Sequence, residues 1–180
     1  MKKRSLALLL ALVLAIGVAA GGTIAWLVAK TDPVVNTFTY GDINIGLAET
    51  TGSDYKIIPG VDITKDPKVT VKANSEACWL FVKVDKAGDF VNGKVNYDIA
   101  DGWTALEGQT GVYYREVEAA TADTSFAVLK DNKITVSDTL TKGDIQALSE
   151  ANKTPTLTFT AYAVQKDGIA DAAAAWAKVG

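Results

Sequence analysis

The side chains that could carry chemistry in this sequence are its carboxylates and one thiol. The chain has 21 aspartates and glutamates, a single cysteine, Cys78, and no histidine. Without histidine, Ser-His-Asp and Cys-His catalytic arrangements cannot form, and neither can a histidine-ligated zinc site or the HExxH helix of a metalloprotease. One cysteine also excludes a disulfide within this sequence and any CxxC metal or redox motif.

The carboxylates do not form a recognisable catalytic pair. Two acids at a suitable separation could hydrolyse a glycosidic bond, but no spacing here selects such a pair. The segment 85–89 could hold a weakly bound Ca²⁺ ion, although an ordinary turn explains it equally well. EF-hand, P-loop and GxSxG motifs are absent. We therefore expect no catalytic residue, no metal and no cofactor, and we expect that the protein is not an enzyme. A hydrolase using acidic residues is a remote alternative. The acids considered are Asp62, Asp66, Asp85, Asp89, Asp98, Asp101, Glu107, Glu116 and Glu118.

Cys78 lies in the apolar run ACWLFVKV. A free cysteine in such a run is typically a small buried residue. We predict a structural role for Cys78, with a reactive or interchain thiol as the alternative.

Length and composition are those of one ordinary domain plus a processing segment. The chain has 180 residues, of which 48% are hydrophobic, and a formal net charge of −3 with a pI near 5.0. This is enough apolar material for a core. The sequence contains no Lys/Arg-rich block beyond residues 2–4, so we expect no nucleic-acid partner.

The N-terminus has the pattern of a secretory signal peptide. Three basic residues at 2–4 precede an apolar run, and small residues follow it at 19–22. Thr23 and Ala25 provide an acceptable cleavage site before Trp26. We predict a helical signal peptide over 1–25, whose removal takes away three basic residues and no acidic ones. The apolar stretch continues to Ala29, roughly long enough to span a bilayer, so an uncleaved membrane anchor is the alternative.

The rest of the sequence is rich in short alternating segments that indicate β-strands. The alternation changes phase at Gly41, which indicates a bulge or a change of sheet. The dipeptides at 59–60 and 66–67 are turn signals that frame a short segment. Expected strands lie within 34–47, 68–72, 78–84, 95–99, 111–117, 126–129, 133–136 and 156–164.

The strand over 78–84 is apolar on both faces. Trp79 and Phe81 lie on one side, and the aliphatic residues that alternate with them lie on the other. Such a strand is either central and covered by a loop, or it presents an aromatic pair to a partner. We therefore name Trp79 and Phe81, together with Trp103, as a candidate exposed binding face.

Two helices and one hairpin complete the expected elements. Residues 141–150 predict a short helix, and the alanine-rich end from 168 to 179 predicts a C-terminal helix. Residues 130–133 predict a hairpin turn between the strands at 126–129 and 133–136. The pattern as a whole predicts a mainly β fold: an antiparallel β-sandwich or jelly roll that carries one or two short helices. We expect one domain over 41–180, preceded by a mature N-terminal segment over 26–40.

Four stretches of the chain, among them YKIIPGVDITKDPKVTVKANSEACWLFVKV, resemble the camelysin/TasA family of Gram-positive bacteria. The sequence GGTIAW and the later NTFTYGDINIGL follow the pattern of that family, and TLTFTAYAVQ near the end fits it too. The matching residues are Gly21, Gly22, Thr23, Ala25, Trp26, Phe38, Gly41, Ile43, Ile45, Pro59 and Gly60. The resemblance extends to about Val84, and the segment 86–153 does not align.

The resemblance implies an exported matrix protein whose signal peptide is cut by a dedicated signal peptidase, SipW. It further implies a jelly-roll domain that polymerises into biofilm fibres when the mature N-terminal segment of one subunit pairs as a strand in the next. In this sequence the donated segment is 26–40, and Pro33 limits pairing at one point. Packing of this segment on its own domain is the alternative. The expected anchors for self-assembly are Trp26, Leu27, Val34, Val35, Phe38 and Tyr40.

Camelysins are also described as metalloproteases, a role from which this chain departs because it has no histidine. The leading hypothesis is a secreted, self-associating fibre protein of the extracellular matrix or cell surface. Its partners are further copies of itself, the signal peptidase and an accessory matrix protein. The alternative is a monomeric surface adhesin or binding module, and a camelysin-like protease is remote.

Overall fold

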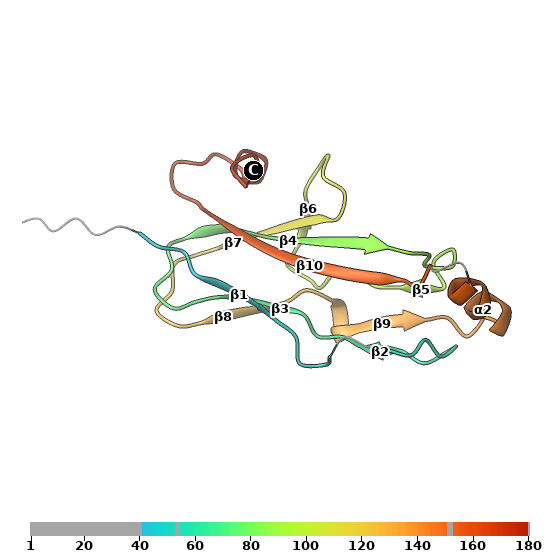
Figure 1. Ribbon diagram of the computed structural model, residues 1–180. Helices are drawn as coiled ribbons and strands as arrows, with labels where there is room; N and C mark the ends of the chain where they lie inside the picture. The colour runs from blue at the N-terminus through green and yellow to red at the C-terminus, as the bar shows by residue number, and fades with distance from the viewer. Residues whose placement is uncertain (1–40, 53–54, 151–152, 180) are drawn as a thin grey trace, which may run out of the picture. The chain divides into compact units, whose positions relative to one another are not determined.

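The computed structural model describes residues 41–52, 55–150 and 153–179, whose strands form three antiparallel sheets (Figure 1). The largest sheet has the order β10-β4-β7-β6, with strands Thr156–Gln165, Cys78–Ala87, Val112–Val117 and Thr104–Ala105. The second has the order β1-β3-β8, with strands Ile45–Ala48, Lys68–Val71 and Thr124–Ala127. The third has the order β2-β9-β5, with strands Ile63–Thr64, Lys133–Val136 and Val95–Asn96. The expected mainly β fold is confirmed.

The main core lies between the largest sheet and the two smaller ones, as in a sandwich (Figure 1). Strand β4 supplies its centre through Leu80, Val82 and Val84, which are at most 3% exposed. Val69 and Val71 of β3 face them from the opposite layer. These alternating apolar residues are what the sequence pattern predicts for strands with one face in a core.

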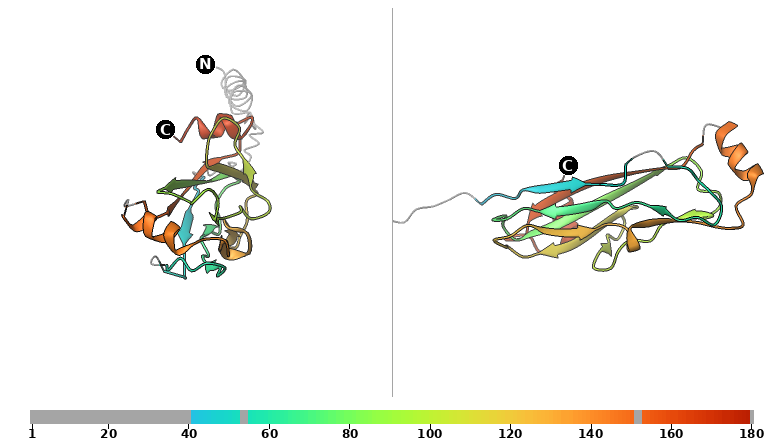
Figure 2. Two further views of the ribbon diagram at one scale, coloured as in Figure 1. Left: turned by 90° about the vertical axis from the view of Figure 1, so that its right-hand side faces the viewer. Right: turned by 90° about the horizontal axis from the view of Figure 1, so that it is seen from below.

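The outer face of the largest sheet is covered by the C-terminal helix α3, Ala172–Trp176 (Figures 1 and 2). The side chain of Asp171 accepts a hydrogen bond from the backbone N–H of Ala174 at 2.8 Å and so caps the helix. Ala172 and Ala175 are buried against the sheet. The predicted C-terminal helix is therefore present but shorter than 168–179, because residues 166–169 form a turn before it.

The predicted turn at Pro59-Gly60 is confirmed. The N–H of Val61 donates to the carbonyl of Ile58 at 3.1 Å, and Gly60 has a φ of 72°. A positive φ at this position of a turn favours glycine, and proline fits the position before it. The turn carries the chain into β2.

The predicted hairpin over 130–133 is wrong. Strand β8 pairs with β3, whereas β9 pairs with β2 and β5 in another sheet. Between them Val128 and Leu129 are fully buried, and the 3₁₀ helix η1, Lys130–Asn132, turns the chain through positive φ angles at its last two residues. The chain passes from one sheet to another here because Val128 and Leu129 are buried in the core, so the chain does not turn back at the surface.

The other predicted helix is present as α2, Lys142–Glu150. In its first turn, the side chain of Asp144 accepts hydrogen bonds from the N–H and the hydroxyl of Thr141, both at 2.8 Å. In Figure 1, α2 lies at the end of the domain where β10 begins. The predicted signal helix over 1–25 and the segment 26–40 lie outside the described residues.

Candidate assembly edge

Strand β10 is an open edge. It pairs with β4 along its whole length, from Thr156 opposite Ala87 to Gln165 opposite Cys78. Among the strands that the structure describes, none pairs with its other side. Such an edge presents a row of backbone N–H and C=O groups that can pair with a further strand.

The core beneath this edge is incompletely covered. Leu157, Phe159, Ala161 and Ala163 point inward from β10 and pack against the core, yet all four are only half-buried. The β4 residues opposite the last three, Val84, Val82 and Leu80, are buried. The inward side chains are therefore buried on β4 but only half-buried on the adjacent β10, whose other side has no described neighbour.

Strand β1 borders the same opening from the other layer. Among the strands of the described part of the chain it pairs with β3 alone, and it also contacts β10. Figure 1 shows β1 departing from β10 toward the end of the domain where β10 begins. Ile45 is half-buried and Leu47 is 39% exposed, so apolar side chains of β1 also face solvent.

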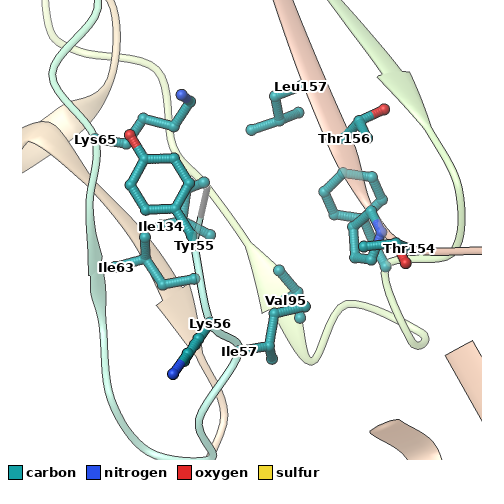
Figure 3. A pocket seen from close by; sticks show the side chains of 12 residues that line it. Tyr55, Lys56, Ile57, Ile63, Lys65, Val95, Ile134, Thr154, Thr156 and Leu157 are labelled. Carbon is teal, nitrogen blue, oxygen red and sulfur yellow. The ribbon is translucent and has the colours of Figure 1, made fainter. Parts of the chain in front are cut away.

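A pocket of about 520 Å³ lies beside the start of β10 (Figure 3). Its walls come from the segment before the Pro59-Gly60 turn, from the third sheet and from the start of β10 (Figure 3). Most of the walls are apolar. The lining residues are Tyr55, Lys56, Ile57, Ile63, Lys65, Phe90, Val95, Ile134, Thr154, Pro155, Thr156 and Leu157.

Lys65 gives the pocket one charged wall. The residue is 7% exposed, and its ammonium pairs with the carboxylate of Glu49. The same ammonium lies 4.8 Å from the ring centre of Tyr55 and 5.7 Å from that of Phe159. A buried lysine needs such a partner, and aromatic rings add cation–π attraction. The pocket therefore offers a neutralised cation and aromatic faces instead of a free charge.

Asp66 holds the loop that carries Glu49 and Tyr55. Its carboxylate accepts a hydrogen bond from the hydroxyl of Thr50 at 2.6 Å and from the N–H groups of Thr50 and Thr51 at 2.9 and 3.2 Å. The hydroxyl and N–H of Thr50, and then the groups of Thr51, lower the pKa of Asp66 to about 2. The ionised carboxylate thus fixes one wall of the pocket.

The expected exposed face at Trp79 and Phe81 is covered. Trp79 is 7% exposed and Phe81 is fully buried. The ring of Trp176, from α3, lies 5.2 Å from that of Phe81 and 5.4 Å from that of Tyr162. The expectation of an exposed pair is wrong because the alanine-rich helix lays small side chains and one tryptophan over these rings.

Trp103, the third residue of that expected face, is half-buried. It packs against the main core, whereas Trp79 and Phe81 belong to the cluster under α3. Its indole N–H donates to the carbonyl of Ala127 at 2.8 Å, and its ring meets Phe126 edge-on at 6.5 Å. Trp103 therefore covers the outer edge of β8 instead of joining an aromatic surface.

The groups considered for chemistry remain apart. Within 41–52, 55–150 and 153–179, no three carboxylates or thiols gather in a way that could hold a metal ion. Cys78 is buried, and burial raises the pKa of its thiol to about 11. The predicted cleavage residues Thr23, Ala25 and Trp26 lie outside the described residues. So do the predicted assembly anchors Trp26, Leu27, Val34, Val35, Phe38 and Tyr40.

Sequence reasoning did not find the pocket. Its walls are separated by about a hundred residues along the chain, and neither wall has a distinctive motif. The only local signal is Pro155, which comes just before the strongest strand pattern in the sequence and marks where an edge strand could begin.

No protein-family model, no curated protein and no solved structure matches this chain. In the part of the chain that the structure describes, neither helix has the length and apolar character needed to cross a bilayer.

Proposed function

We propose that this chain is a secreted structural protein of the bacterial extracellular matrix that self-assembles into fibres. In this proposal, residues 26–40 of one copy add as a strand to β10 of the next. The observation that carries it is the open edge of β10, whose inward side chains are only half-buried along the full length of the strand. The resemblance to the camelysin/TasA family supports the same reading, including the jelly-roll form of the completed domain.

The dimensions agree with strand addition. Strand β10 has ten residues, which span roughly 33 Å at about 3.3 Å per residue. The fifteen residues from Trp26 to Tyr40 reach about 50 Å when extended. The segment is therefore long enough to follow the whole edge and still connect to its own domain.

The physical gain comes from two sources. Backbone groups along β10 acquire partners, and apolar side chains of the added strand cover the half-exposed core. Head-to-tail contacts of this kind do not close on themselves, so they produce filaments. The proposal gives the chain no catalytic role, no metal and no cofactor. An accessory matrix protein that nucleates the fibre is compatible with it.

A peptide capture experiment tests the proposal. The domain Gly41–Gly180 is mixed with a synthetic peptide of residues 26–40, and binding is followed by calorimetry and by the melting temperature of the domain. Strand addition predicts that the native peptide binds saturably and raises the melting temperature of the domain. A peptide with the same residues in scrambled order should neither bind nor change the melting temperature. A folded domain that ignores the native peptide contradicts the proposal.

A monomeric surface binding module is the second candidate, and the pocket beside β10 is the observation that favours it. A cavity of about 520 Å³ with mainly apolar walls is within the size range of small-molecule sites, roughly 300–1,000 Å³. This candidate predicts that the mature chain stays monomeric at every concentration. Filament formation by the purified chain would therefore count against it.

A further inference from the structure

We propose that the added strand has one direction and one anchor: residues 34–40 of the next copy run antiparallel to β10 and place Phe38 in the pocket. This inference rests on the proposed function and specifies the polarity of the fibre. Three observations carry it: the positions of the chain's exit and of the pocket, the alternation of residues 34–40, and the chemistry of the pocket walls.

The chain leaves the domain at the end where β10 finishes. Just before β1, the carbonyl of Asp42 accepts a hydrogen bond from the N–H of Glu76 at 3.0 Å. Just after β10, the N–H of Lys166 donates to the carbonyl of Ala77 at 2.8 Å. The loop over 72–77 thus meets both the start of β1 and the end of β10.

The pocket lies at the opposite end, because Thr156 and Leu157 at the start of β10 line it. Figures 1 and 2 show the same arrangement: the blue start of the described chain and the orange helix α2 lie at opposite ends of the domain. The exit of one copy and the pocket of another can therefore meet end to end.

Only one strand direction uses this arrangement. An antiparallel strand places its C-terminal end, at Tyr40, beside the start of β10, so the donor's domain follows directly beyond the pocket. A parallel strand would place Tyr40 at the end of β10 and bring the exit ends of two copies together. Antiparallel addition also continues the pairing of every ladder in the largest sheet.

The alternation of the segment selects the face that points inward, and the position of the pocket then sets the register. Val34, Asn36, Phe38 and Tyr40 lie on one face of a strand, and residues directly opposite in an antiparallel pair point to the same side. If this face points inward, Phe38 lies opposite Leu157, whose side chain lines the pocket. Pro33 has no N–H to donate, so residues 34–40 are the part of the segment in which the pairing is uninterrupted.

The same register agrees with the polar group of the pocket. It places Asn36 opposite Phe159, whose ring lies 5.7 Å from the ammonium of Lys65. The polar side chain between Val34 and Phe38 on the inward face thus lies on the side of the pocket where Lys65 pairs with Glu49. Phe38 meets the mainly apolar walls, where an aromatic side chain can bury roughly 150–250 Å².

Engineered cysteines test the direction in the mature chain from Trp26. The register puts Thr39 opposite Thr156, at a separation suitable for a cross-strand disulfide. Thr39→Cys combined with Thr156→Cys should give a ladder of covalent oligomers on a non-reducing gel after mild oxidation. Thr39→Cys combined with Gln165→Cys, at the other end of β10, should give none. Native Cys78 is buried and serves as an internal control. The reverse pattern overturns the direction while leaving strand addition intact.

A pair of neighbouring isoleucines tests the anchor. Ile57 lines the pocket and is half-buried, whereas Ile58 is 49% exposed and is not part of the lining. Ile57→Asp should raise the concentration needed for filament formation by roughly tenfold or more, and Ile58→Asp should change it little. Phe38→Ala, which leaves the described domain unaltered, should match Ile57→Asp, and the two changes together should add little to either.

The outcomes separate the two proposals. Filaments from the unaltered chain with equal behaviour of Ile57→Asp and Ile58→Asp overturn the pocket as the anchor site but leave the proposed function standing. Filaments in which Phe38→Ala has no effect overturn Phe38 as the anchor. A mature chain that forms no filaments and a Gly41–Gly180 domain that binds no peptide overturn both proposals.

Discussion

Phe159 and Val84 lie opposite each other in the ladder between β10 and β4, yet Val84 is 3% exposed and Phe159 is only half-buried. Both side chains point into the same core. The difference arises because β4 has a neighbour on each side, whereas β10 has one described neighbour. The difference between these two residues therefore identifies the outer side of β10 as the place where a further strand could add to the sheet.

A charge on the inner side of the open edge should block assembly without unfolding the domain. Inward charges on edge strands are a known protection against strand addition. In Ala161→Lys, the long side chain can reach solvent through the opening beside β10. We expect the free energy of unfolding of the domain to fall by no more than about 1 kcal/mol, and assembly to be lost. Denaturant titration and sedimentation velocity measure the two effects.

Thr158→Lys is the matched control for this change. Thr158 is exposed and lies on the outer face of the same strand. It adds the same charge to β10 but does not enter the space that an added strand would cover. Equal loss of assembly in both variants would show that net charge, and not the inner edge, controls association.

The thiol of Cys78 should be inert in the folded protein. Burial raises its pKa to about 11, and the thiolate is the reactive form. At pH 8 we expect almost no reaction with a thiol reagent such as Ellman's reagent until denaturant unfolds the domain, and then one equivalent per chain. Rapid labelling in native buffer, or disulfide-linked dimers of the unaltered protein, would contradict the structural role of Cys78.

Asp66 should make the domain less stable in acid. Its pKa is about 2 in the folded protein because Thr50 and Thr51 donate hydrogen bonds to its carboxylate, and it is near 3.9 in an unfolded chain. Because the folded state lowers the pKa, the stabilisation is complete above about pH 4 and is lost as the pH falls toward 2. Urea titrations between pH 2 and 5 measure this loss.

Replacing Asp66 separates its contribution from that of other acids. Asp66→Asn should lower stability at pH 6 and flatten the decline between pH 4 and 2, while the exposed Asp101→Asn should leave stability at pH 6 unchanged. The pKa of Asp144 is also lowered to about 2, mainly by Lys94. Protonation of Asp144 should therefore still lower the stability of both variants as the pH falls. An Asp66→Asn domain with the original slope would contradict the assignment.

Trp176 should stabilise the domain by covering the outer aromatic cluster. Its ring contacts Phe81 and Tyr162, and truncation leaves a gap above a fully buried phenylalanine. Because Trp176 is half-buried, we expect Trp176→Ala to reduce the free energy of unfolding by about 2–3 kcal/mol. The exposed Lys178→Ala should stay within about 0.5 kcal/mol of the original domain. Two equal values in denaturant titration would contradict the role of Trp176.

The strands with strong alternation could be predicted from the sequence. The segments around Leu80 and Phe159 were expected as strands, and they form the longest ladder of the fold. Local pattern suffices there because each strand has a continuous apolar face. The turn at Pro59-Gly60 was predictable for a similar reason, since its backbone angles depend on those two residues.

Features that depend on tertiary packing could not be predicted in this way. The sequence around Lys130 has the composition of a hairpin turn, but the burial of Val128 and Leu129 sends the chain into another sheet. The pattern at Trp79 and Phe81 predicts a strand that is apolar on both faces but does not show what covers it, and α3, almost a hundred residues away, does so. The pocket likewise joins distant segments, so no local pattern indicates it.

The most direct measurement of the central claim compares the chain from Trp26 with the chain from Gly41. Both are examined over the same concentration series by sedimentation velocity and negative-stain electron microscopy. Strand addition at β10 predicts filaments of uniform width for the longer chain and folded monomers for the shorter one. Filaments from both chains, or monomers from both at every concentration, would contradict assembly through residues 26–40.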